Sequence, residues 1–111
     1  MSREPMDLLQ GTLDVLILSS LSIGEMHGYA ITRSIRERTK GELDIEDAPL
    51  YKSLHRLERA GAVTAEWGIS ENNRRARYYK LTPSGRQLLK SEESAWRRYA
   101  TAVFAVLEPA T

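Results

Sequence analysis

The sequence has no cysteine, a single phenylalanine, and no apolar run near the roughly 20 residues of a membrane-spanning helix. Without cysteine the chain has neither disulfides nor thiolate metal ligands, and His27 and His55 alone make a poor metal site. The first residues lack the basic, apolar and small-residue regions of a signal peptide. We therefore expect a cytoplasmic protein with no metal, no cofactor and no membrane contact.

Catalytic signatures are also missing from the sequence. Serine, histidine and aspartate are present, but there is no nucleophile elbow, no glycine-rich phosphate loop and no cluster of metal ligands. The 111 residues are enough for one domain with a modest hydrophobic core. We therefore expect a small protein that is not an enzyme.

Basic residues are concentrated in one part of the chain, although the net charge is only +1. Residues 1–50 contain five Lys/Arg and nine Asp/Glu, residues 51–86 contain eight and three, and residues 87–111 contain three and three. A local excess of positive charge matters more for binding phosphates than the total charge does. A solvated basic surface would give the same distribution, so charge alone leaves both explanations open.

The basic segment begins inside a helix predicted over residues 47–60. Asp47 is predicted to cap its start and Gly61 to end it in the left-handed conformation. Three leucines at spacings of four and three share one side: Leu50, Leu54 and Leu57. The opposite side has no carboxylate and carries Lys52, His55, Arg56 and Arg59. A short basic helix anchored by leucines suits a DNA major groove.

Periodicity predicts the other elements. Two helices come first, one from Leu8 or Thr12 to Leu21 and one from Met26 or His27 to about Lys40. Residues 63–67 and 76–81 alternate around a polar turn and predict a β-hairpin. A last helix is predicted from about Pro83, with Thr82 as its cap, to Leu107.

Two local features are less decisive. In the connector 41–47, Leu43 and Ile45 alternate with acidic residues, which is compatible with one short strand. Gly28 in the first turn of the second helix is compatible with a close approach between helices or with a simple irregularity at the helix start.

The predicted fold class is mainly α with a small β-hairpin. Three helices followed by a hairpin and a long helix are the order of a winged helix-turn-helix, in which the third helix enters the major groove and the hairpin, or wing, reaches a neighbouring groove. We expect a DNA-binding domain over residues 8–81 and a long C-terminal dimerisation helix over residues 82–108.

Several stretches together resemble PadR-type transcriptional regulators: LLQGTLDVLILSSL, MHGYAI, LYKSLHRLERAGAV, AEWG and ENNRRARYYKLTPSG. The resemblance covers roughly residues 8–89, and the length is similar to that of the short subfamily with one C-terminal helix. It implies a homodimer that binds a palindromic operator in double-stranded DNA, mostly as a repressor. Some members release DNA when a small aromatic effector binds. Lys52 replaces a proline that is common in the family pattern, which puts the preferred operator in doubt.

Eight residues are candidates for contact with DNA: Tyr51, Lys52, His55 and Arg56 on the predicted recognition helix, and Asn73, Arg74, Arg75 and Arg77 on the hairpin. Lysine and arginine can reach phosphates or guanine, and asparagine favours the turn. Three of the eight have an open alternative, namely a core position for Tyr51, an internal hydrogen bond for His55 and an intrachain pair for Arg77.

The last helix carries an apolar stripe with near-heptad spacing, which needs a partner. We expect that partner to be the same helix of a second copy, together with the first helix. The candidate interface residues are Leu9, Leu13, Trp96, Tyr99, Val103 and Val106. Trp96 has two open roles, because paired Trp96 rings would either pack the interface or line a cavity that stacks on a flat effector.

The sequence thus predicts a sequence-specific DNA-binding transcriptional regulator that forms a homodimer. The resemblance implies that it acts as a repressor and that a small, aromatic effector releases it from DNA. Two alternatives stay open: a winged-helix domain that serves protein–protein interaction, and one that binds nucleic acid without sequence preference. The arginines of the hairpin and the carboxylate-free helix face argue against the first alternative.

Overall fold

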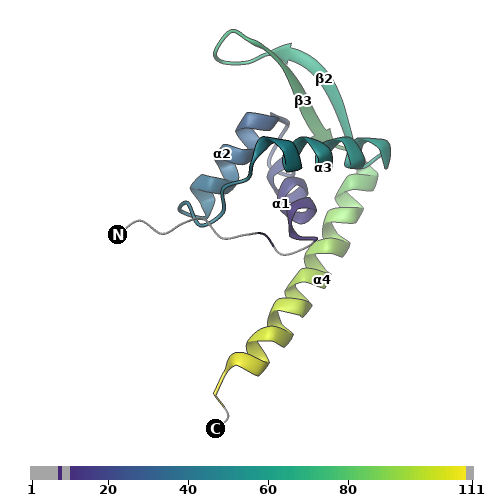
Figure 1. Ribbon diagram of the computed structural model, residues 1–111. Helices are drawn as coiled ribbons and strands as arrows, with labels where there is room; N and C mark the ends of the chain where they lie inside the picture. Colours follow the sequence, from purple (N-terminus) through teal and green to yellow (C-terminus); the bar gives the residue numbers. More distant parts are fainter. Residues whose placement is uncertain (1–7, 9–10, 110–111) are drawn as a thin grey trace.

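The computed structural model describes residue 8 and residues 11–109. Its elements are, in order, α1 (Thr12–Leu21), β1 (Met26–His27), α2 (Gly28–Arg38), α3 (Asp47–Arg59), β2 (Val63–Ile69), β3 (Arg75–Leu81) and α4 (Pro83–Leu107). Three helices, a hairpin and a long last helix are therefore confirmed. In Figure 1, the β2–β3 hairpin rises beyond α3 on one side of the molecule, and α4 extends away on the other.

The hydrophobic core lies where α1, α2 and α3 meet the base of the hairpin. Its buried members are Ile17, Leu18, Leu21, Ile31, Ile35, Ile45, Leu50, Leu54, Leu57, Ala62, Val63, Tyr79 and Leu81. Burying one leucine or isoleucine side chain contributes about 1.5–3 kcal/mol. The three leucines of α3 therefore determine which side of that helix faces inward, as their spacing predicted.

The small sheet differs from the prediction. It has three strands in the order β1–β3–β2, because Met26 and His27 pair with Tyr79 and Tyr78 of β3. The connector before α3 forms no strand in the described part of the chain, so the alternation of Leu43 and Ile45 was misleading. Both side chains pack on the core, and this packing alone accounts for their alternation with acidic residues.

The starts of the first two helices are close to those predicted. Thr12 is the first residue of α1, and Gly11 precedes it with φ of 85° in the left-handed region. His27 is the N-cap of α2, since its Nδ1 accepts a hydrogen bond from the backbone N–H of Ala30 at 3.1 Å.

One helix cap was predicted wrongly. Asp47 is not the N-cap of α3 but its first residue, and Glu46 occupies the N-cap without a side-chain cap bond. Asp47 still places a negative charge in the first turn, where the helix dipole favours it.

The end of α3 follows the prediction for Gly61, whose φ is 79°. The N–H of Gly61 donates to the carbonyl of Glu58, and the N–H of Ala62 donates to that of Leu57, at 3.0 and 2.9 Å. These two bonds form a Schellman motif, which satisfies the last carbonyls of the helix. The chain then turns directly into β2.

The start of α4 is fastened to the end of α3. The Thr82 hydroxyl donates to the Gly61 carbonyl at 2.6 Å and accepts from the Gly85 N–H at 2.9 Å, so it also caps α4. Gly85 lies against the Ala62 carbonyl so closely that a Cβ there would overlap the backbone. The first turn of α4 is therefore packed against, and hydrogen-bonded to, the segment that connects α3 to the hairpin. None of the helices in residues 11–109 combines the length and apolar character of a membrane span.

Candidate nucleic-acid interface

The exposed side of α3 carries the predicted basic residues. Lys52 and His55 are exposed, and neither side chain has a hydrogen-bond or ion-pair partner among the residues that the structure describes. Since the buried leucines fix the rotation of the helix, both side chains point away from the core. They are therefore free to contact a partner molecule.

Tyr51 is partly packed and partly exposed, so its position is compatible with both roles that the sequence left open. Its side chain is 42% exposed, yet its phenol lies directly over Gly28, where a Cβ would overlap the ring. The predicted close approach at Gly28 is thus confirmed, with a tyrosine of α3 as the neighbour. Partial burial, and then the charges of Tyr79 and Asp47, raise the pKa of Tyr51 above its usual 10.0. At neutral pH its hydroxyl is a neutral hydrogen-bond donor.

Arg56 is paired inside the chain. Its Nη1 and Nη2 donate to the two carboxylate oxygens of Asp14 on α1 at 2.6 and 2.8 Å, and Nη2 also lies 3.4 Å from the Ser53 Oγ. Hydrogen bonding to Asp14 and its negative charge raise the pKa of Arg56. A bidentate pair of this kind fixes the guanidinium in direction as well as in position. Arg56 therefore connects α3 to α1.

Arg77 is also paired. Its Nη2 donates to Oε2 of Glu58 at 2.9 Å, so the intrachain alternative for Arg77 is the one that the structure shows. Glu58 lies in the last turn of α3, and Arg77 lies on β3. This ion pair joins the recognition helix to the wing.

The hairpin tip has the predicted turn. Asn73 has φ of 57°, the left-handed conformation that asparagine tolerates, and its N–H donates to the Ser70 carbonyl at 2.8 Å. The Ser70 N–H closes the turn on the Arg74 carbonyl at 2.8 Å. Arg74 and Arg75 follow, both exposed, at the end of the molecule farthest from α4.

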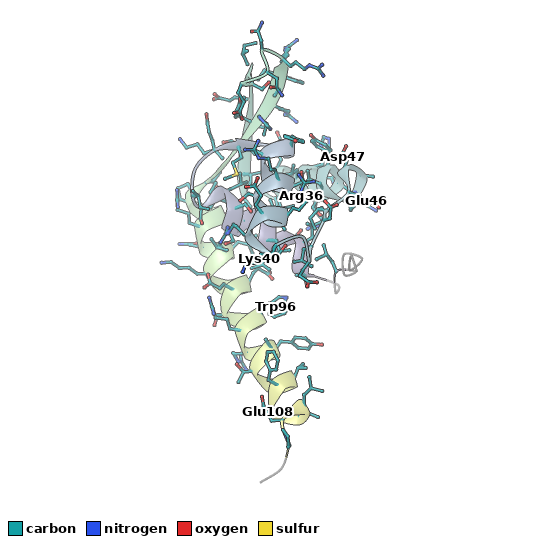
Figure 2. The ribbon with its side chains drawn as sticks, turned by 90° about the vertical axis from the view of Figure 1, so that its left-hand side faces the viewer. Arg36, Lys40, Glu46, Asp47, Trp96 and Glu108 are labelled. Atoms are coloured by element: carbon teal, nitrogen blue, oxygen red, sulfur yellow. The ribbon has the colours of Figure 1, made fainter. Side chains whose placement is uncertain are left out.

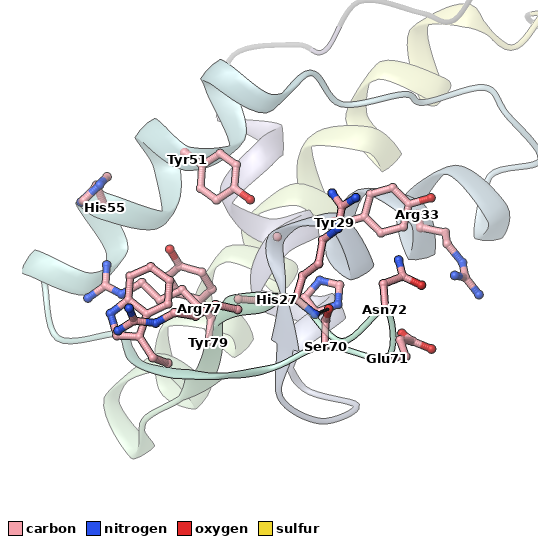
Figure 3. A pocket seen from close by; sticks show the side chains of 15 residues that line it. His27, Tyr29, Arg33, Tyr51, His55, Ser70, Glu71, Asn72, Arg77 and Tyr79 are labelled. Carbon is pink, nitrogen blue, oxygen red and sulfur yellow. Dashed lines mark hydrogen bonds between the residues drawn. The ribbon is translucent and has the colours of Figure 1, made fainter.

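α3, the start of α2 and the wing enclose an open cleft of about 1030 Å³. Figure 3 shows Tyr51 and His55 on α3, Tyr29 and Arg33 on α2, and Arg77 and Tyr79 on the hairpin. Arg74 and Arg75 also line the cleft. The structure thus brings five of the eight predicted DNA-contact residues to one surface, namely Tyr51, His55, Arg74, Arg75 and Arg77. Lys52 is exposed on α3 but does not line the cleft.

The far half of α4 leaves apolar side chains in solvent. Tyr99, Val103 and Val106 are 59%, 38% and 84% exposed, as a stripe that needs a partner would be. Phe104 and Leu107 are exposed as well. Leu13 is half-buried against the core, and Leu9 lies outside the described residues.

Trp96 lies where α4 leaves the body of the molecule (Figure 2). Its Nε1 donates to the Thr12 Oγ1 at 3.2 Å, and its ring meets that of Tyr99 edge to face at 6.2 Å. A groove of about 370 Å³ runs beside it between α1 and α4, lined mainly by Val15, Leu16, Leu89 and Trp96. Trp96 therefore has one polar anchor and one face on an apolar groove.

Sequence reasoning missed several residues that shape the cleft or the exposed end of α4. Asp14 is the one acidic residue in α1, and that isolation within an apolar helix was a usable signal. Trp67, 60% exposed on the wing, gave only a strand pattern in the sequence. Phe104 falls beside the predicted stripe of α4, whereas Leu107 is four residues after Val103 and lies on the stripe, so its spacing was a usable signal.

A helix-turn-helix with an exposed basic third helix and an arginine-bearing wing defines a winged-helix DNA-binding protein. The model of the transcriptional regulator PadR-like family matches residues 17–91. The chain belongs to this family, whose members are DNA-binding transcription factors rather than enzymes.

Known relatives agree with this assignment. A transcriptional regulator of Mycobacterium tuberculosis is 31% identical over 87 residues, which cover 78% of each chain. The crystal structure of a PadR family transcription regulator from Clostridium difficile R20291 has 27% identity and a TM-score of 0.75, covering 88% of this chain and 100% of that one. A transcriptional regulator from Clostridium thermocellum has 30% identity and a TM-score of 0.80, covering 89% and 93%.

The Arg56–Asp14 pair is expected to stabilise the placement of α3. In a double-mutant cycle of Asp14→Asn and Arg56→Gln, we expect a coupling free energy of about 1 kcal/mol, at the upper end for exposed pairs, because the contact is bidentate. Urea unfolding followed by circular dichroism measures it. The matched control is the exposed Arg33–Glu37 pair, where the same cycle should give about 0.5 kcal/mol or less. Equal couplings in the two cycles would contradict this role.

Proposed function

We propose that this protein is a homodimeric, sequence-specific transcriptional repressor that a small aromatic effector releases from its operator. In this proposal, α3 enters the major groove of a half-site and the wing contacts the neighbouring groove or backbone. The α4 helices of two copies pair and set the distance between the two half-sites.

The observation that carries the proposal is the shared surface of α3 and the wing. His55 of α3 lines the same cleft as the wing's Arg74 and Arg75, and Lys52 is exposed on the same helix. Neither Lys52 nor His55 has a side-chain partner among the residues that the structure describes. Phosphate neutralisation provides much of the affinity for DNA, and a helix can read base edges only if its side chains are unpaired. The surface meets both conditions.

The predicted DNA-contact residues divide into those proposed to touch DNA and those proposed to hold the surface in shape. Arg74 and Arg75 are assigned to phosphate or minor-groove contact, Lys52 and His55 to base edges or phosphates, and Tyr51 to a phosphate through its hydroxyl. Arg56 and Arg77 are bound to carboxylates, so direct contact with DNA would require their pairs to open. For these two we propose that they fix α3 and the wing in position. Asn73 shapes the turn.

The exposed apolar end of α4 supports the homodimer. Four large apolar side chains of this segment, Tyr99, Phe104, Val106 and Leu107, are at least 59% exposed, and they follow Trp96 along the same helix. A second copy of α4 would cover them and the groove together. This supports residues 82–108 as the dimerisation segment and residues 8–81 as the DNA-binding domain, and we place the protein in the cytoplasm with the DNA.

The groove beside Trp96 supports the effector. Its volume is within the usual range for small-molecule sites, and its lining is apolar apart from Thr12, Ser19 and two charged residues at its rim. Indole rings stack on flat aromatic molecules. An effector in this groove would lie between α1 and α4, the two elements that we propose form the dimer interface.

Selection of bound sequences from a random DNA pool tests the central claim. We expect a palindrome with about ten base pairs between half-site centres. Lys52→Ala should change the preferred base at one position of each half-site and weaken binding by about 1–3 kcal/mol if Lys52 reads a base edge. Enrichment of no sequence would support non-specific binding, and no retained DNA at all would support a role in protein–protein contact.

Val103→Asp tests the dimer. A carboxylate in an apolar helix pair is costly to bury, so we expect the dimer to dissociate at least about tenfold more readily, which sedimentation velocity over a concentration series measures. Ala105→Asp is the matched control, because residue 105 is exposed and lies about 200° around the helix from residue 103. A dimer unaffected by Val103→Asp would place the interface elsewhere.

Fluorescence of Trp96 tests the effector. In a Trp67→Phe background, Trp96 is the only tryptophan, and a panel of planar aromatic compounds should include some that quench or shift its emission. The same compounds should lower the affinity for the selected operator in a competition assay. If no compound in a broad panel changes the emission, the groove is not an effector site.

A further inference from the structure

One face of the hairpin continues outward from the core. The register places Val63, Ala65, Trp67 and Ile69 of β2 on the same face as Leu81, Tyr79, Arg77 and Arg75 of β3. Near the base this face is buried, with Val63 and Tyr79 in the core. Farther out it leaves the core, and Trp67 and Ile69 are 60% and 65% exposed.

Rings and guanidinium groups alternate along this face. The Arg77 guanidinium lies 5.9 Å from the Tyr79 ring centre, and the Arg75 guanidinium lies 4.5 Å from that of Trp67. Trp67 is directly opposite Arg77 in the register. Glu58 of α3, Arg77, Trp67 and Arg75 are therefore successive neighbours along this face, joined by an ion pair, a cross-strand pair and a cation–ring contact.

The two arginines differ in charge balance. Arg77 is neutralised by Glu58, whereas Arg75 has no carboxylate partner in the part of the chain that the structure describes. Its guanidinium lies over the Trp67 ring, which restricts its direction, and it has no side-chain hydrogen bond to any described residue, so its donors are available. A long arginine side chain on an exposed turn otherwise samples many rotamers.

We propose that Trp67 is a positioning residue: its ring holds the Arg75 guanidinium on the cleft side of the wing, so that Arg75 meets a DNA phosphate already oriented. Replacing the Trp67 ring should change the free energy of unfolding little, because most of the surface of the ring is in solvent. Tryptophan is also the ring with the strongest attraction for a cation. This inference rests on the proposed contact of the wing with DNA.

Arg74 is the internal comparison. It is adjacent to Arg75, exposed and on the same cleft, but its guanidinium has no ring or ion-pair partner among the described residues. If Trp67 acts through Arg75, the loss of DNA affinity on replacing Trp67 should require Arg75 and should not require Arg74.

The test is a pair of double-mutant cycles on the full chain. Affinity for a fluorescein-labelled duplex of the selected operator, and for a random duplex, is measured by anisotropy over a salt series. Trp67→Leu should weaken binding to both duplexes by about two- to fivefold, the range expected for an exposed cation–ring contact. Arg75→Ala should weaken binding to both duplexes by more than this. It should also make the slope of log K against log [salt] less steep by about 0.9, the value for one lost phosphate contact.

Coupling decides the role of Trp67. In an Arg75→Ala background, Trp67→Leu should cause no further loss, whereas in an Arg74→Ala background its effect should be unchanged. Trp67→Tyr should bind more tightly than Trp67→Leu, because it keeps a ring at this position. Arg75→Lys should bind more tightly than Arg75→Ala, because it keeps the charge, but less tightly than the unaltered chain, because lysine is held less firmly by the ring. Thermal unfolding by circular dichroism confirms that each variant is folded.

The failures can be told apart. If Arg75→Ala leaves the affinity and the salt slope unchanged, the wing does not contact DNA, and both this inference and the wing part of the proposed function are wrong. If Arg75→Ala weakens binding but Trp67→Leu is neutral, or acts equally with and without Arg75, DNA contact stands and the positioning role is wrong.

Discussion

The structure depends on the burial of one side of α3. Leu50 and Leu54 are fully buried and Leu57 is almost so, between α1, α2 and the base of the hairpin. This burial sets the rotation of α3, and it leaves Lys52 and His55 facing outward. A polar residue at any of the three positions would remove the anchor and leave the direction of the exposed face undefined.

Three contacts then set the tilt of that face. The Tyr51 phenol lies over Gly28 of α2, Arg56 binds Asp14 of α1, and Glu58 binds Arg77 of the wing. Each contact connects α3 to a different neighbouring element. Two of the three use arginines of the kind that a charge pattern assigns to DNA, so part of the basic segment organises the surface and only the remainder is left to bind.

Much of the fold could be predicted because its signals are local. The spacing of the α3 leucines, the left-handed Gly61, the Thr82 cap and the hairpin turn at Asn73 each depend on a few neighbouring residues. The ion pairs could not be predicted in this way, because Arg56 and Asp14 are 42 positions apart. The two-residue strand β1 is too short to show a period, and it exists only because β3 is beside it. Most of the basic surface was therefore predicted, but not which arginines are already bound.

The fastening of α4 to α3 has a mechanical consequence. Thr82 and Gly85 hold the first turn of α4 against the end of α3. With 25 residues at about 1.5 Å each, α4 is a lever roughly 37 Å long. A tilt of about 5° at one end shifts the other by about one base-pair step, roughly 3.4 Å. In a dimer joined through the far ends of α4, a molecule that wedges α4 away from α1 would alter the spacing of the two recognition helices without touching either of them.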